Sequence, residues 1–134
     1  APWLVFRGAV MTGQCRGTPT EVRMDVAFGY LGTMQIELIE QKNDAVSPYR
    51  GGAGAPLVGV HHVAWMVDDL AGEVGAAGAR GLSVAFSAAN ETTKVAYLEG
   101  PAQPGVLLEL IESSVTRELI RDGIAAARAW DGSG

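Results

Sequence analysis

Two nearly identical five-residue segments, IELIE at 36–40 and LELIE at 108–112, constrain the fold of this chain more than any other feature. Related segments this far apart in a 134-residue chain indicate a duplicated structural unit. Each segment places a glutamate, Glu37 or Glu109, inside an aliphatic run that is typical of a buried strand. A carboxylate among core-forming residues is costly unless it is paired, protonated or bound to a metal ion. The repeat therefore predicts both the architecture and the place where the chemistry lies.

The first half of the chain is predicted to form three strands in an antiparallel meander. Residues 3–7 are rich in β-forming side chains, whereas the polar segment 8–21, marked by glycine and proline, is predicted to be a loop. Alternation of apolar and polar residues indicates a half-buried strand at 22–28. A turn at 29–32 then leads into a strand over 33–40, which carries the first glutamate segment.

The second half is predicted to read strand, helix, strand, strand, strand, and to end in a further helix. A segment rich in Gly, Pro, Asn and Asp at 41–59 precedes it. Asp68 or Asp69 can cap the first helix, and the segment GPAQPG at 100–105 turns the chain into the last strand. The expected strands are 60–67, 82–86, 94–98 and 106–112, and the expected helices are 70–77 and 116–130.

The two halves match unequally. We divide the chain into a first module at 1–50, a linker at 51–59 and a second module at 60–134. When the glutamate segments are aligned, the first-module counterpart of the strand at 60–67 falls roughly 10–20 residues before Ala1. The first module therefore lacks an opening strand and helix. Three explanations stay open: an incomplete record of a longer protein, a strand supplied by a second copy, or a vestigial site. The start without methionine favours the first.

Composition narrows the class of protein. The apolar content of 48% and charged content of 19% are typical of a globular domain. The net charge of −5 and the absence of a basic stripe make nucleic acid a poor candidate partner. A single cysteine, Cys15, allows no intrachain disulfide and favours a reducing, cytoplasmic location. No apolar run is long enough to span a membrane, so we expect no membrane partner.

Two adjacent histidines, His61 and His62, fall on the predicted strand at 60–67. Neighbouring side chains on a strand point to opposite faces, so at most one of them can enter a shared site. A single such histidine, or a single strand glutamate, is more often structural or open to water than a ligand. Together, one histidine and one or two glutamates on the concave face of a half-barrel would supply nitrogen and oxygen donors for a divalent metal.

The motifs GVHHVAWMVDDL, VAYLEG and GVLLELIE, preceded by DVAFGYLGTMQIELIEQ, resemble the vicinal oxygen chelate superfamily. That family includes glyoxalase I, methylmalonyl-CoA epimerase, extradiol dioxygenases, and fosfomycin- and bleomycin-resistance proteins. The resemblance covers nearly the whole chain and is strong for fold but weak for reaction. It implies an α+β fold of paired βαβββ modules that form a half-barrel cleft, here with the first module incomplete.

The resemblance also implies a set of site residues. Metal ligands in this family come from the first and fourth strands of each module, which correspond here to His62, Glu109 and Glu37. The remaining ligand would come from a first strand that this sequence does not contain, and His61 would face the outer layer. The implied cofactor is a divalent metal such as Zn, Ni, Co, Mn or Fe. A small-molecule substrate and a homodimer are the implied partners.

Three functions follow from these residues. The first is a bacterial metal-dependent isomerase, epimerase or lyase acting through an enolate or enediolate on a small oxo or CoA-linked substrate. Glu37 or Glu109 would carry the proton, and Phe28, Trp65 and Tyr97 would contact the substrate. The alternative is a non-catalytic binder, similar to drug-resistance proteins, with aromatic cleft walls at Trp3, Phe6, Tyr30, Trp65 and Tyr97. The third is an extradiol-type dioxygenase, which would need a second inward histidine.

Overall fold

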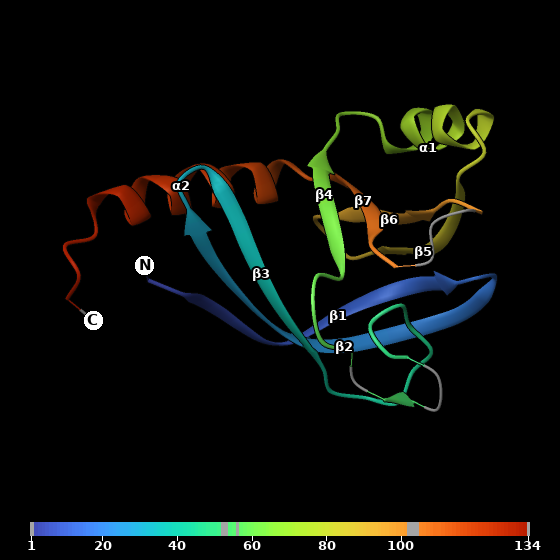
Figure 1. Cartoon of the computed structure of the whole chain (residues 1–134), viewed down its shortest axis with the longest axis horizontal. Coiled ribbons are helices and arrows are strands. Elements are labelled where there is room, and N and C mark those ends of the chain that lie inside the picture. The colour runs from blue at the N-terminus through green and yellow to red at the C-terminus, as the bar shows by residue number, and fades with distance from the viewer. Residues whose placement is uncertain (1, 52–53, 56, 102–104, 134) are drawn as a thin grey trace.

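A computed structural model describes residues 2–51, 54–55, 57–101 and 105–133. It contains a single curled sheet of seven strands in the order β3-β2-β1-β5-β6-β7-β4, with two helices (Figure 1). The fold class and the half-barrel shape are therefore as predicted. The elements are β1 (Leu4–Cys15), β2 (Thr18–Leu31), β3 (Met34–Gln41), β4 (His62–Met66), α1 (Leu70–Ala79), β5 (Ser83–Ala89), β6 (Lys94–Glu99), β7 (Leu107–Glu112) and α2 (Ser114–Ala129).

The first half is an antiparallel meander, as predicted, but its first two strands are much longer than expected. The predicted loop at 8–21 is wrong, because β1 and β2 form one hairpin that turns at Arg16 and Gly17, both with positive φ. Position 13, within β1, must be glycine, because any Cβ there would collide with the backbone of Ser87 on β5. A glycine that reads as a strand breaker is thus required for close approach of the two halves.

The pairing of β1 with β5 joins the two halves into one sheet. The paired residues run from Thr12 opposite Ala89 to Cys15 opposite Phe86. A common core lies on the concave side of this junction, where both halves contribute side chains with under a tenth of their surface exposed. Its members are Cys15, Val22, Met24, Val26, Ala85, Phe86, Ala88, Val95, Tyr97 and Leu107. The alternation predicted for 22–28 is confirmed by Val22, Met24 and Val26.

The second half has the predicted order of strand, helix and three strands. Asp69 caps α1 by accepting a hydrogen bond from the Gly72 amide at 3.1 Å. The strand β4 pairs in parallel with β7, whereas β5, β6 and β7 pair antiparallel to one another. Ser113 caps α2 through the Thr116 amide at 3.0 Å. The predicted turn at 100–105 and the linker at 51–59 lie partly outside the described residues.

The two edge strands of the sheet are β3 in the first half and β4 in the second. Among the described residues, β3 pairs only with β2, so its outer edge has no neighbour equivalent to β4. The helix α2 crosses the end of β2 (Figure 1), where Tyr30 donates a hydrogen bond to the Leu119 carbonyl at 3.3 Å. No described helix has the length and apolarity to cross a membrane.

Candidate metal centre

Three side chains from the two edges and the interior of the sheet converge at one point. They are Glu37 on β3, His62 on β4 and Glu109 on β7, and one donor atom from each lies within 4.8 Å of the others. The Nε2 atom of His62 is 3.1 Å from Oε2 of Glu37 and 3.8 Å from Oε1 of Glu109. The curl of the sheet therefore brings both predicted glutamates and the predicted histidine together.

Strand register explains why these side chains share one face. Glu109 lies opposite Ala64 on β4 and opposite Tyr97 on β6. His62 is two residues before Ala64, so it points to the same face as Glu109. Glu37 in turn lies opposite Phe28 on β2. The imidazole of His62 thus bridges an edge strand of each half, although backbone pairing of β3 with β4 is absent from the described sheet.

Burial and neighbouring charges change the pKa values of the site residues. Glu109 is 5% exposed, and burial raises the pKa of its carboxyl group to about 7, against an ordinary value of 4.5. Burial would lower the pKa of His62, but the hydrogen bond to Glu37 and the charges of both carboxylates outweigh it, so that pKa is raised. Two carboxylates around one imidazole favour a positive charge at their centre, either a proton on His62 or a metal ion.

A layer of tyrosines supports Glu109 from behind. The Tyr49 hydroxyl donates to the Tyr97 hydroxyl at 2.9 Å, and Tyr97 hydrogen-bonds to Glu109. Tyr97 is 1% exposed, and its ring packs edge-on against His62 with centroids 5.0 Å apart. Burial raises the pKa of both tyrosines, so both hydroxyl groups stay protonated and available as donors. Glu109 is therefore held in place by groups that cannot rearrange freely.

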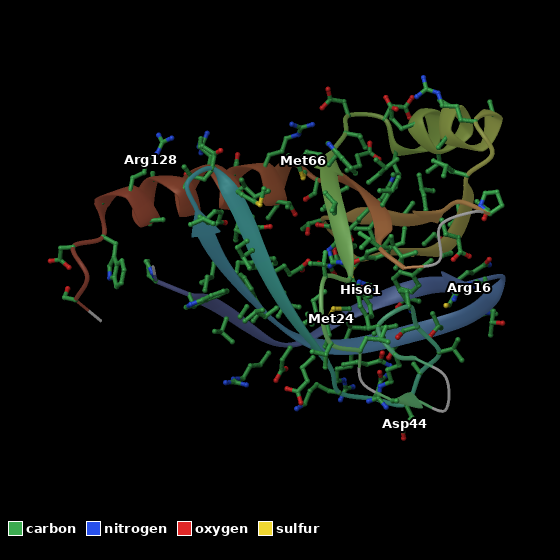
Figure 2. The ribbon with its side chains drawn as sticks, in the orientation of Figure 1. Arg16, Met24, Asp44, His61, Met66 and Arg128 are labelled. Carbon is green, nitrogen blue, oxygen red and sulfur yellow. The ribbon has the colours of Figure 1, made fainter. Side chains whose placement is uncertain are left out.

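The expectation that His61 faces the outer layer is wrong. Its Nδ1 atom is 2.9 Å from Nδ1 of His62, and its Nε2 atom is 2.7 Å from the Pro48 carbonyl oxygen. The strand β4 begins only at His62, so strand alternation does not apply to His61. His61 lies immediately before β4 (Figure 2), and its ring packs against buried Tyr97 on the inner side of the curled sheet. Both histidines therefore belong to the site.

The three residues predicted to contact substrate occupy different environments. Phe28 lies beside Glu37 on the same face and packs edge-on against Phe6 at 5.9 Å. Tyr97 is buried beneath the two histidines rather than lining an open wall. Trp65 is 51% exposed and lies on the face of β4 opposite to His62. Only Phe28 is both near the donors and partly exposed.

The other aromatic residues expected to form cleft walls are dispersed. Trp3 is 50% exposed and covers Gly29, on the face of β2 opposite to Phe28. Phe6 contacts Phe28, whereas Tyr30 packs against α2. A cavity of about 580 Å³ lies away from the donors, between α1 and the strands β5 and β6. Its lining contains none of the three donor residues.

Two site residues, Pro48 and Tyr49, were missed by the sequence interpretation because they fall in the segment at 41–59 that is rich in Gly, Pro, Asn and Asp. The segment is fixed by hydrogen bonds from Thr20 Oγ1 to the Val46 carbonyl at 2.6 Å and from Gln41 Nε2 to the Ala45 carbonyl at 2.8 Å. These bonds bring Pro48 to His61 and Tyr49 to Tyr97. The one sequence signal for this role is a Pro-aromatic pair in an otherwise polar segment.

The donor set fits a divalent metal. One imidazole nitrogen and two carboxylate oxygens suit Zn, Mn, Fe, Co or Ni, and a cation among them would offset the cost of burying Glu109. The buried side of the site already has hydrogen-bonded supports for two of the three donors, as metal sites require. Fold and site together define an α+β protein with one curled seven-stranded sheet and a candidate metal centre on its inner face.

Comparison with known families agrees with this class. The chain belongs to the Glyoxalase/Bleomycin resistance protein/Dioxygenase superfamily, whose family model matches residues 3–97. The resemblance inferred from the sequence motifs is therefore confirmed. The search of curated proteins found no match. The metal identity, a homodimeric assembly and a cytoplasmic location stay predictions.

Proposed function

We propose that this protein is a metal-dependent isomerase, epimerase or lyase that moves a proton on the carbon beside a carbonyl group. The observation that carries the proposal is the convergence of one histidine and two carboxylates within 4.8 Å on the inner face of a superfamily fold. The substrate class is a small oxo compound or a CoA-linked acyl group.

His62, Glu37 and Glu109 would hold the metal ion. When bound, the metal would supply Lewis acidity that polarises a substrate oxygen and favours loss of the neighbouring proton. The protein supplies the remaining chemistry: a carboxylate to move the proton, and a fixed frame that keeps it in reach.

The two carboxylates are suited to different roles. The Glu109 side chain is 6% exposed and is held by Tyr97, which suits a permanent ligand. The Glu37 side chain is 25% exposed, and it forms a hydrogen bond with His62. Because Glu37 is the more accessible and the less tethered, we assign to it the transfer of the proton. Phe28, directly across from Glu37, provides an apolar surface for the substrate beside the reacting carbon.

The extradiol-type function is less well supported by the same geometry. An iron site of that type uses two histidines and one carboxylate. His61 is close to His62, but both of its ring nitrogens are engaged, one by His62 and one by the Pro48 carbonyl. The described residues therefore assemble one histidine and two carboxylates, the set expected for proton transfer rather than oxygen activation.

The test begins with elemental analysis of protein purified without chelators. The protein is then stripped, reloaded with Zn, Ni, Co, Mn or Fe, and incubated in D₂O with acyl-CoA thioesters and hemithioacetals. We expect one metal ion per chain. We also expect the α-proton of the substrate to exchange for deuterium, and NMR measures this exchange. Glu37→Gln should abolish exchange but leave measurable metal binding. The matched control is Glu40→Gln, whose side chain is 71% exposed on the other face of β3.

Three outcomes contradict the proposal. They are the absence of stoichiometric metal, metal that binds without any α-proton exchange, and exchange that persists unchanged in His62→Ala. Tight binding of a planar ligand that survives exhaustive chelation would instead support the non-catalytic binder.

A further inference from the structure

The hydrogen bonds of His61 determine where its proton lies. The Pro48 carbonyl oxygen can only accept a hydrogen bond, so Nε2 of His61, 2.7 Å away, must carry the hydrogen. The Nδ1 atoms of His61 and His62 are 2.9 Å apart, so only one of them can carry a hydrogen, and His61 already carries its hydrogen on Nε2. A neutral imidazole with its hydrogen on Nε2 has a lone pair on Nδ1. His61 therefore offers only an acceptor to His62.

The same reasoning determines the state of His62. Its Nδ1 atom is 2.9 Å from the acceptor Nδ1 of His61, so Nδ1 of His62 must be the donor. When His62 is neutral, its lone pair then lies on Nε2, the atom that faces Glu37 and Glu109. A lone pair between two carboxylates is repelled by both unless a cation lies there. The hydrogen bonds from the Pro48 carbonyl through His61 to His62 thus leave Nε2 of His62 without a hydrogen, and this atom faces the candidate metal position.

We infer that His61 is a positioning residue that, anchored by the Pro48 carbonyl, fixes His62 in the Nδ1–H tautomer and so presents Nε2 to a divalent cation. A hydrogen bond to the far nitrogen of a ligating histidine orients the ring and makes it a better ligand. This inference rests on the metal site of the proposed function, but not on the reaction assigned to it.

The packing around His61 leaves its ring little freedom. Its ring lies 5.2 Å from Tyr49 with an interplanar angle of 33°, and 5.9 Å from Tyr97 at 69°. The loop that carries Pro48 is fixed to the sheet by Thr20 and Gln41. A ring rotation in His61 would bring Nδ1 towards other groups and break both hydrogen bonds at once. The acceptor is therefore rigidly placed behind His62.

Metal affinity measures the contribution of His61. The dissociation constants for Zn²⁺ and Co²⁺ are measured by calorimetry or chelator competition for the wild type and for His61→Phe. This variant keeps an aromatic ring but has no hydrogen-bond acceptor. Loss of an outer hydrogen bond to a ligand typically weakens binding by about 10–100-fold, and we expect a decrease in this range. His61→Asn retains an acceptor oxygen, so its affinity should lie between the two. Urea unfolding of the metal-free variants confirms that each is folded.

Histidine NMR tests the tautomers directly. The chain has only two histidines, so long-range ¹H–¹⁵N spectra report all of their ring nitrogens without overlap. In alkaline, metal-free protein we expect hydrogen on Nε2 of His61 and on Nδ1 of His62. Added Zn²⁺ should shift Nε2 of His62 and leave the His61 tautomer unchanged. The spectra need no activity, and they remain decisive in a protein that catalyses nothing.

The inference is overturned by any of three results. These are hydrogen on Nδ1 of His61, Zn²⁺ on Nδ1 of His62, or His61→Phe protein that is folded and binds Zn²⁺ as tightly as wild type. Failure of the proposed function looks different. Metal that binds as expected without any α-proton exchange refutes the reaction, while the tautomers and the affinity loss still stand.

Discussion

The two halves of the sheet place equivalent residues in the same register but bury them to different extents. Glu37 lies opposite Phe28 in the first half, and Glu109 lies opposite Tyr97 in the second. In the second half, β4 covers the edge of β7, and the Glu109 side chain is 6% exposed. In the first half, β3 is an edge strand, and the Glu37 side chain is 25% exposed. Covering one edge thus separates two equivalent carboxylates into a fixed group and an accessible one.

The largest expected difference between the halves is in core stability. Phe86 is fully buried in the second half, so Phe86→Ala should cost about 3–5 kcal/mol of unfolding free energy. Phe28→Ala should cost less, because the Phe28 ring packs at the margin of the core. Urea unfolding of metal-stripped protein measures both, since bound metal would add its own stabilisation. Equal losses would show that the first half is as tightly packed as the second.

The second difference concerns the cost of the buried carboxylate. The native pKa of Glu109, about 7, lies above its ordinary 4.5, so the native state binds more protons than the unfolded state between these values. Stability of metal-stripped protein should therefore fall as pH rises through this window. Glu109→Gln removes this effect and should be up to about 3 kcal/mol more stable at pH 8.

Unfolding curves at pH 5 and pH 8 check this prediction. Glu37→Gln removes a carboxylate that is 25% exposed, so it should stabilise the protein less than Glu109→Gln does. The exposed control Glu40→Gln should change the unfolding free energy by less than about 0.5 kcal/mol. If the unfolding free energy of Glu109→Gln changes with pH as steeply as that of the wild type, then the cost assigned to burying Glu109 is contradicted.

The third difference is the tyrosine layer, which lies behind Glu109 and has no counterpart behind Glu37 among the described residues. Tyr97→Phe removes the acceptor of the buried Tyr49 hydroxyl, and an unsatisfied buried donor costs about 1–3 kcal/mol. Tyr49→Phe should cost less, because Tyr97 retains its bond to Glu109. In the double variant no hydroxyl is left unpaired, so its loss should be smaller than the sum of the two. Strict additivity in this double-mutant cycle would show that the two hydroxyls do not interact.

Local patterns predicted the parts of this molecule that depend on neighbours along the chain. Alternation at 22–28 gave the buried face of β2, and the repeated segments gave the equivalence of Glu37 and Glu109 in register. The family motif placed His62 beside them. The cap of α1 is Asp69, one of the two residues predicted for it, whereas the Ser113 cap of α2 was not predicted and that helix begins two residues earlier than expected.

The features that could not be predicted depend on contacts between distant segments. Gly13 reads as a loop residue until β5 is placed against it. His61 reads as an outward-facing strand residue until β4 is seen to start at His62, two positions later than predicted. Pro48 and Tyr49 read as part of an irregular segment, because their roles exist only once the loop folds back onto His61 and Tyr97. None of these contacts leaves a periodic pattern in the sequence.

The smallest expected effect tests whether the different freedom of the two carboxylates matters for turnover. Phe28→Tyr places a hydroxyl across from Glu37 in the register that lets Tyr97 bond to Glu109. A hydrogen bond to a charged group contributes about 1.5 kcal/mol at the low end, so a tethered Glu37 should transfer the proton about tenfold more slowly. Zn²⁺ affinity should change little, since both carboxylates remain.

Comparing the α-proton exchange rate with the Zn²⁺ dissociation constant separates the effect on proton transfer from the effect on metal binding. If the exchange rate is unchanged while NMR shows the new hydroxyl bonded to Glu37, then freedom of that carboxylate is not what distinguishes the two halves.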